Sequence, residues 1–118
     1  MKILVADDDL LMLKTLEFRL KKDGHTVFTT RDGREALAQI AIINPDLIIT
    51  DLMMPYSSGM EIVGAVRQMP GKKIPIIILS AMGQESVVLE AFQLGADDYI
   101  TKPFSPNELS VRVRRFMV

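Results

Sequence analysis

Short runs of consecutive apolar residues alternate along the chain with longer stretches in which apolar residues recur every three or four positions. The first pattern is typical of buried strands and the second of amphipathic helices. The predicted strands cover 2–6, 25–29, 47–50, 76–79 and 99–101. Because runs such as 76–79 are continuously apolar, the strands are expected to form a parallel sheet covered by helices on both faces. With right-handed crossovers, this pattern predicts a doubly wound α/β fold of five parallel strands in a single domain.

Helix start and stop signals separate these strands. Helices are predicted at about 10–23, from Asp32 to 43, from Ser58 to 69, at about 84–94, and from Ser105 onward. Asp32, Ser58 and Ser105 each stand three residues before a Glu, which is the spacing of a capping box, whereas the helix at 84–94 lacks a strong N-cap. The apolar faces of these helices are expected to be buried, and they comprise Leu13, Leu16, Leu20, Leu37, Ile40, Ala41, Ile62, Val66, Met69, Leu109, Val113 and Phe116.

Composition narrows the possible functions. The 118 residues suffice for one domain, expected at 1–118, and the net charge of −1 disfavours direct binding of nucleic acid by this domain. The chain has no Cys, which excludes disulfides and thiol catalysis, and His25 is its only histidine. We expect a cytoplasmic protein that does not enter the membrane, because no targeting segment is visible and the longest apolar run is too short for a span.

Chemically active residues follow the predicted strands. Asp7 and Asp8 come after the first strand, Asp51 after the third, Ser80 after the fourth and Lys102 after the fifth. The carboxyl ends of parallel strands meet at one edge of the sheet, where ligands bind in folds of this class. The pattern therefore predicts that carboxylates, a hydroxyl and an amine converge at one site.

Crowded carboxylates repel each other, and a divalent cation that prefers oxygen ligands relieves the repulsion. Mg²⁺ is the expected cofactor, because it keeps several waters and usually takes only one or two protein carboxylates. A cation, Lys102 and the Ser80 hydroxyl around an aspartate would form a cradle for the oxygens of a phosphoryl group.

Each residue also has an ordinary structural interpretation. Asp9 is predicted to cap the first helix, and Asp7 and Asp8 taken alone resemble loop or capping carboxylates. Ser80 is compatible with a turn and Lys102 with an exposed surface position. The functional interpretation is favoured because all of these residue types fall at the appropriate ends of the appropriate strands.

Four segments carry a family resemblance: KILVADDD at 2–9, DLMMP at 51–55, LSA at 79–81 and GADDYITKPF at 95–104. In this order and spacing they resemble the receiver domain of two-component response regulators, over the whole chain. The resemblance implies a flavodoxin-like sheet with strand order 2-1-3-4-5. It also implies a regulatory phosphoacceptor, not an enzyme acting on other molecules, whose partner is a sensor histidine kinase or a phosphotransfer protein.

The resemblance further implies a role for each matching residue. Asp51 would accept the phosphoryl group, and Mg²⁺ would be held by Asp7, Asp8, Asp51 and the backbone carbonyl of Met53. The residues implied to contact the phosphoryl group are Ser80, Ala81 and Lys102. Ser80 and Tyr99 would act as switch residues, and the Lys102–Pro103 bond would be cis.

The output face is predicted to comprise the fourth helix, fifth strand and fifth helix, because the fourth helix has more apolar residues than one buried stripe requires. Arg112 and Arg115 lie one helical turn apart and near Asp97 and Asp98 in the chain. Such acid–base pairs resemble those used for homodimerisation in regulators with DNA-binding effector domains. A solvated charged surface explains the same residues equally well. An effector domain of this kind would follow in a longer protein.

The chain departs from the family pattern in the loop beside the site. Tyr56 stands where the family usually has Gly, Ser58 where it has Asp, and Ser80 replaces the commoner Thr but keeps the hydroxyl. Met53 and Met82, two residues past Asp51 and Ser80, cannot orient water by hydrogen bonding. We therefore expect slow self-dephosphorylation.

Three other functions are weighed against the receiver. An FMN-binding electron carrier needs a phosphate-binding loop after the first strand, where the three aspartates would repel a phosphate. A phosphatase with an aspartyl-phosphate intermediate commonly has a second Asp two residues after the nucleophile, where this chain has Met53. A receiver that no longer accepts phosphate is disfavoured by the intact set of Asp8, Asp51, Ser80 and Lys102.

Overall fold

A computed structural model of the chain describes residues 1–54, 56 and 58–117. Pro55 of the DLMMP segment and Val118 at the end of the expected domain lie outside the described residues. The elements in chain order are β1 (Lys2–Ala6), α1 (Leu10–Lys22), β2 (Thr26–Thr30), α2 (Gly33–Ile43), β3 (Leu47–Asp51), α3 (Gly59–Gln68), β4 (Ile76–Ala81), α4 (Glu85–Leu94), β5 (Asp98–Lys102) and α5 (Pro106–Arg114). None of the helices among the described residues is long and apolar enough to cross a membrane.

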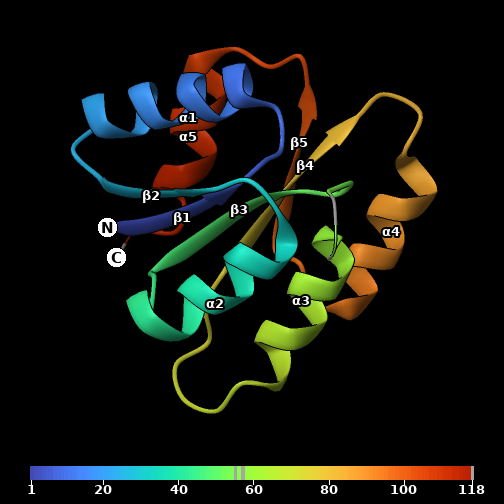
Figure 1. Cartoon of the computed structure of the whole chain (residues 1–118). Coiled ribbons are helices and arrows are strands. Elements are labelled where there is room, and N and C mark those ends of the chain that lie inside the picture. The colour runs from blue at the N-terminus through green and yellow to red at the C-terminus, as the bar shows by residue number, and fades with distance from the viewer. Residues whose placement is uncertain (55, 57, 118) are drawn as a thin grey trace.

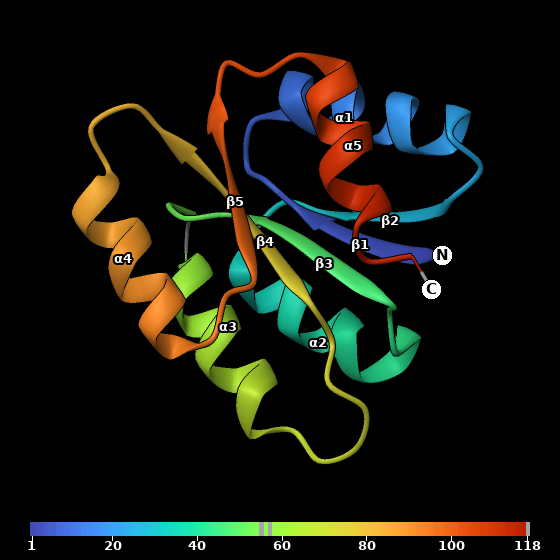
Figure 2. The ribbon, with the colours of Figure 1, turned by 180° about the vertical axis from the view of Figure 1, so that it is seen from behind.

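Five parallel strands form one sheet in the order β2-β1-β3-β4-β5, which confirms the strand order implied by the resemblance. Helices α1 and α5 cover one face of the sheet, and α2, α3 and α4 cover the other (Figures 1 and 2). Because each strand is followed by a helix that returns the chain to the starting edge, all carboxyl ends of the strands lie together.

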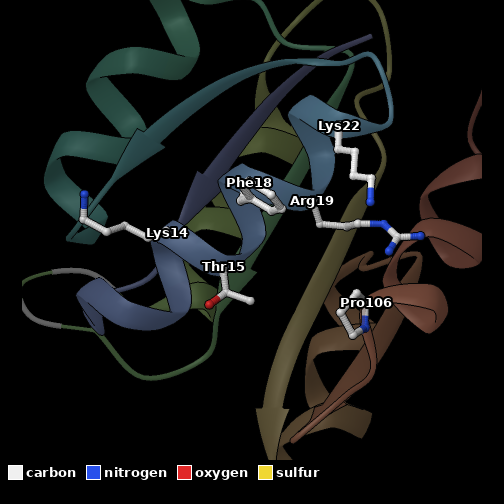
Figure 3. A pocket seen from close by; sticks show the side chains of 6 residues that line it. All are labelled: Lys14, Thr15, Phe18, Arg19, Lys22 and Pro106. Carbon is white, nitrogen blue, oxygen red and sulfur yellow. The ribbon is translucent and has the colours of Figure 1, made fainter.

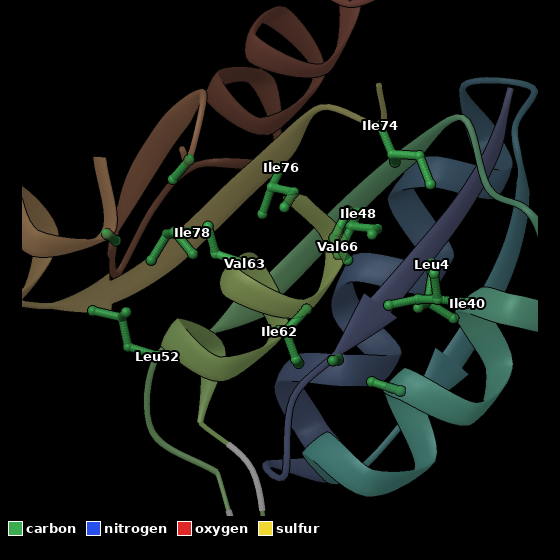
Figure 4. Close-up of a cluster of buried hydrophobic side chains, with 14 of the residues drawn as sticks. Leu4, Ile40, Ile48, Leu52, Ile62, Val63, Val66, Ile74, Ile76 and Ile78 are labelled. Atoms are coloured by element: carbon green, nitrogen blue, oxygen red, sulfur yellow. The ribbon is translucent and has the colours of Figure 1, made fainter. Parts of the chain in front are cut away.

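Alternate residues of β1, β3 and β4 pack into two separate hydrophobic clusters, one on each face of the sheet. On β1, Ile3 and Val5 pack with the buried residues of α1 and α5, whereas Leu4 and Ala6 pack with those of α2, α3 and α4. Figure 4 shows the second cluster, in which Leu4 lies beside Ile40 of α2. The inner strands β1, β3 and β4 carry uninterrupted apolar runs because both faces of the sheet exclude water, whereas exposed residues interrupt the edge strands β2 and β5.

Helices α1 and α5 are joined by polar contacts as well as by the core. The Arg19 guanidinium extends from α1 toward α5 (Figure 3) and donates from Nε to Ser110 Oγ (2.8 Å) and from Nη2 to Asn107 Oδ1 (3.1 Å). Ser110 in turn donates to the Asp23 carboxylate at the end of α1. These contacts fix the two helices on the same face of the sheet.

Strand boundaries differ from the sequence prediction by one or two residues. The second strand begins at Thr26, not at 25, because Thr26 is the first residue that pairs with β1, whereas the His25 N–H donates to Leu20 O in the turn after α1. β4 continues through Ser80 to Ala81, which pair with Thr101 and Lys102 of β5. Backbone pairing thus extends the strand past the last apolar residue, which the side-chain pattern alone did not indicate.

Several helix predictions were wrong in detail. Ala41 and Met69 are exposed, and Phe116 lies beyond the end of α5 and is only partly buried. Within the described residues, only Ser58 forms a complete capping box, with Glu61; Asp32 and Ser105 cap their helices without the reciprocal glutamate contact. In the helix capped by Ser105, Glu108 Oε2 accepts from Arg112 Nη2 at 3.5 Å. The Glu108 side chain thus points along the helix and not toward the backbone N–H of Ser105.

Candidate functional site

The predicted site residues converge at the carboxyl edge of the sheet. Asp7 follows β1, Asp51 ends β3, Ser80 lies near the end of β4 and Lys102 ends β5. The strands that carry Asp7, Asp51 and Ser80 are successive neighbours in the sheet, and β5 lies beside β4. A long lysine side chain is therefore needed to reach back across the edge, and Lys102 does so.

The Lys102 ammonium lies between two carboxylates. Its Nζ is 3.0 Å from Asp7 Oδ2 and 3.4 Å from Asp51 Oδ2. The Lys102 side chain is only 21% exposed, and those of Asp7 and Asp51 are 0% and 14% exposed. The peptide bond from Lys102 to Pro103 is cis, in agreement with the resemblance.

Asp7 is held rigidly by the chain around it. Its Oδ1 accepts the backbone N–H of Asp9 at 2.9 Å, while its Oδ2 accepts from Lys102. Asp9 itself caps α1 by accepting from the backbone N–H groups of Leu11 and Met12, as its sequence position predicted. The start of α1 thus fixes the orientation of the buried carboxylate.

Three carboxylates at this edge are close enough to share a metal ion. One oxygen each from Asp7, Asp8 and Asp51 lies within 4.8 Å of the others. Asp7 is buried, Asp51 is partly buried and Asp8 is exposed, so the cluster opens to solvent on one side. A single ammonium does not neutralise three carboxylates, and a divalent cation with oxygen ligands fits the remaining charge.

Burial changes the pKa values of both charged partners. Burial raises the pKa of Asp51; the Lys102 ammonium opposes this rise, and the Asp7 carboxylate adds to it. Burial by itself would lower the pKa of Lys102, but the hydrogen bond to Asp7 and the charges of Asp51 and Asp7 outweigh it and raise that pKa. Lys102 therefore stays charged, and the Asp51 carboxylate takes up a proton more readily than an ordinary exposed aspartate does.

Ser80 and Ala81 line one side of the site. Ser80 is 2% exposed, and the backbone N–H of Ala81 donates to Gln84 Oε1 at 2.7 Å. A pocket of about 360 Å³ extends from these residues between α4 and β5, where the rings of Phe92 and Tyr99 meet edge to face with centroids 5.9 Å apart. Sequence reasoning missed Gln84, although the weak N-cap of α4 was a signal at that position.

Tyr56 borders the opposite side of the site. The Arg34 guanidinium lies 4.3 Å from the centroid of the Tyr56 ring, which is a cation–π contact between α2 and the loop after β3. Tyr56 has a φ of 70°, a left-handed conformation that favours glycine, and glycine is the residue expected there from the resemblance. Asp8, Arg31 and Tyr56 line a shallow polar pocket, so the aromatic ring lies near the exposed carboxylate.

Of the two aspartates predicted to pair with Arg112 and Arg115, only Asp98 does so. Asp98 accepts from both Arg112 (2.9 Å) and Arg115 (3.0 Å). Asp97 instead accepts from Arg67 of α3 at 2.7 Å and from the backbone N–H of Ile76 at 2.8 Å. Asp97 therefore links α3 to the amino end of β4 and is not paired with Arg112 or Arg115.

A doubly wound sheet with three carboxylates and one lysine at its carboxyl edge defines a class of phosphoacceptor domains in signal transduction. The family model of the response regulator receiver domain matches residues 3–114. The chain therefore belongs to this family, which implies a phosphoacceptor role in two-component signalling.

Individual relatives agree with this assignment. The chain is 40% identical over 116 residues to the alkaline phosphatase synthesis transcriptional regulatory protein PhoP of Bacillus subtilis, covering 98% of this chain and 48% of that protein. It thus spans about half the length of this curated relative. Among solved structures, the chemotaxis response regulator CheY4 of Vibrio cholerae matches with a TM-score of 0.91 and 34% identity, covering 98% of each chain. The Francisella response regulator 1452 receiver domain matches with a TM-score of 0.89 and 38% identity, covering 98% of this chain and 94% of that one.

The raised pKa of Asp51 predicts how stability depends on pH in metal-free buffer. The folded protein binds a proton on Asp51 more tightly than the unfolded chain does. Ionisation of Asp51 therefore reduces the stability of the fold as the pH rises above 3.8, the ordinary pKa of an aspartate, and through the raised pKa of the folded state. Asp51→Asn should therefore raise the Tm at pH 7, and the gain should disappear below about pH 3.8.

Asp46 is the matched control for this thermal unfolding series, because it directly precedes β3, the strand that ends at Asp51. Its hydrogen bond from Lys72, together with the backbone N–H of Lys2, lowers its pKa. Asp46→Asn should therefore lower the Tm at pH 7, a change of opposite sign. A lower Tm for Asp51→Asn at pH 7 would contradict the prediction.

Proposed function

We propose that residues 1–118 form the receiver domain of a response regulator in which Asp51 accepts a phosphoryl group from a histidine kinase or a phosphotransfer protein. The observation that carries the proposal is the Lys102 ammonium between Asp7 and Asp51. Both oxygens of Asp7 have partners and its side chain is fully buried, whereas Asp51 is partly exposed and contacts the ammonium at the longer distance. Asp51 is thus the Lys102-bound carboxylate that an incoming phosphoryl group can reach.

The transfer is a substitution at phosphorus. An Asp51 carboxylate oxygen attacks the phosphorus of a phosphohistidine, the new O–P bond forms, and the P–N bond breaks with its electron pair left on the imidazole nitrogen. Charge develops on the phosphoryl oxygens during this step. Lys102, the Ser80 hydroxyl and the backbone N–H of Ala81 are the groups of this chain that we assign to those oxygens.

Mg²⁺ is the metal we assign to the acidic cluster, with Asp7, Asp8, Asp51 and the backbone carbonyl of Met53 as its protein ligands. When bound, it supplies positive charge that neutralises the carboxylates and the phosphoryl oxygens. The preference of Mg²⁺ for oxygen ligands and retained waters suits a cluster that is open to solvent at Asp8.

The output of the domain is assigned to the face formed by α4, β5 and α5, with Ser80 and Tyr99 as the switch residues. The apolar pocket between α4 and β5 connects Ser80 to Tyr99, which supports this assignment. Homodimerisation through the same face and a DNA-binding effector domain in a longer protein are compatible with the match to half of PhoP. Family membership supports a cytoplasmic location and a regulatory role.

An FMN carrier and an aspartyl-phosphate phosphatase are not supported. Three carboxylates occupy the edge where a flavin phosphate would bind, and their charge repels a phosphate that arrives without a metal. The position two residues after Asp51 carries Met53, which is exposed and cannot act as an acid.

Labelling by acetyl phosphate tests the acceptor. In the presence of Mg²⁺, the wild-type chain should gain one phosphoryl group and Asp51→Ala should gain none, as measured by mass spectrometry of the intact chain. Asp46→Ala removes the aspartate that directly precedes β3 and should label as the wild type does. Equal labelling of Asp51→Ala and the wild type would refute the assignment of Asp51.

The metal assignment predicts that Asp8→Asn weakens Mg²⁺ binding by about tenfold or more, since even outer-shell partners of metal sites contribute about 10- to 100-fold. Calorimetric titration with Mg²⁺ measures the affinity. Asp9→Asn is the control, because Asp9 caps α1 and asparagine is an equally good cap. Unchanged Mg²⁺ affinity in Asp8→Asn would exclude Asp8 as a ligand.

Slow loss of the phosphoryl group is expected from the two exposed methionines that flank the site. Met53 and Met82 are 62% and 80% exposed, and neither can hold a water for in-line attack on phosphorus. The double variant Met53→Asn, Met82→Glu should lose phosphate at least several-fold faster, as followed by the decay of labelled Asp51. Met117→Asn is the control, and a decay rate in the double variant no faster than that of the wild type would contradict the prediction.

A further inference from the structure

The side chain of Gln84 accepts a hydrogen bond from a backbone N–H group at the edge of the site. Its Oε1 accepts the N–H of Ala81 at 2.7 Å, a short contact between the end of β4 and the residue before α4. Ala81 directly follows the buried Ser80, and its N–H is one of the groups assigned above to the phosphoryl oxygens. The amide is therefore already paired in the chain without a phosphoryl group.

The orientation of Gln84 differs from that of the other helix-capping residues. Asp9, Asp32, Ser58 and Ser105 each accept backbone N–H groups of their own helices. Among the helices of the described residues, α4 is the one whose N-cap side chain makes no bond to its own first turn. Gln84 thus links α4 back to β4 instead of capping α4.

The two ends of α4 are held by different contacts. At the far end, Gly95 O accepts from Arg67 Nε at 2.9 Å, and Arg67 is also paired with Asp97 at 2.7 Å. Gly95 has a φ of 121°, and a Cβ there would come within 2.9 Å of Arg67 Nε. At the near end, Glu85 and Ser86 are exposed, and the first buried residue of the helix is Val88. Val87 and Val88 anchor the inner side of the first turn in the core, and the Gln84 contact is a polar tether of this turn to β4.

A phosphoryl oxygen and the Gln84 amide oxygen compete for the same donor. One N–H makes one strong hydrogen bond, and a bond to a charged oxygen is roughly twice as strong as one to a neutral amide. We propose that Gln84 is a latch, which pairs with the Ala81 N–H in the unphosphorylated chain and is displaced when the phosphoryl group binds, so that the first turn of α4 is released while its far end stays fixed by Arg67. The proposal rests on the proposed function and names a regulator of that same site.

The latch opposes binding of the phosphoryl group, because its bond to Ala81 must break first. Removing a typical hydrogen bond of this kind changes an equilibrium by about two- to tenfold. Gln84→Ala should therefore bind BeF₃⁻ in the presence of Mg²⁺ about two- to tenfold more tightly than the wild type. Gln84→Glu keeps an acceptor and adds negative charge beside the phosphoryl oxygens, so it should bind BeF₃⁻ more weakly than the wild type.

The experiment combines BeF₃⁻ titration, followed by NMR, with amide hydrogen exchange of the same chains. Gln93→Ala is the matched control, because it removes an exposed glutamine from the same helix, far from Ala81. Without BeF₃⁻, the Ala81 amide should exchange faster in Gln84→Ala than in the wild type and in Gln93→Ala. When BeF₃⁻ binds, the Val88 amide, which donates to Gln84 O at 2.9 Å, should exchange faster in the wild type, while Gly95 should not change.

The outcomes separate the latch from the function on which it rests. Failure of the wild-type chain to bind BeF₃⁻ would overturn the proposed function, and the displacement step with it. Binding by the wild type with equal or weaker affinity in Gln84→Ala would overturn the latch alone. Equal exchange of the Ala81 amide in Gln84→Ala and the wild type would show that the contact does not protect this donor, and would also overturn the latch.

Discussion

The ammonium group of Lys102 is the interaction on which the site depends. It reaches from the end of β5 to Asp7 after β1 and to Asp51 at the end of β3, and so bridges strands that are not neighbours in the sheet. Without this charge, the carboxylates of Asp7 and Asp51 would repel each other in a largely buried edge of the sheet. The ammonium opposes the rise that burial causes in the pKa of Asp51, whose side chain stays partly exposed.

The fold makes this arrangement possible by covering both faces of the sheet. Residues such as Leu4 and Val5 point to opposite hydrophobic clusters, so the polar ends of the strands are the places where charged groups can gather. The buried Asp7 is acceptable there because both of its oxygens have donors, one of them the backbone N–H of Asp9. The carboxylates at this edge repel one another, which disfavours folding, and the hydrophobic clusters on both faces of the sheet supply the stability that keeps them together.

In the proposed latch, helix α4 links the site to the surface of the molecule. Its far end is fixed by Arg67 and its near end is tied to β4 through Gln84. The apolar pocket beside it contains Tyr99 and Phe92, whose rings are in contact. Under the proposed latch, loss of the Gln84–Ala81 bond releases the first turn of α4 while its far end stays held by Arg67.

The sequence by itself determined the strand and helix order and the set of residues at the carboxyl edge, because periodicity and strand-end position are local properties of the chain. Asp7, Asp8, Asp51, Ser80 and Lys102 were all predicted to meet there, and they do. Only the tertiary structure decided which carboxylate is buried, that β4 continues through Ser80, and that Asp97 pairs with Arg67 and not with the final helix. It also revealed the contact of Gln84 with Ala81. These features depend on which side chains meet across elements distant in sequence or across a turn, and local patterns do not encode such meetings.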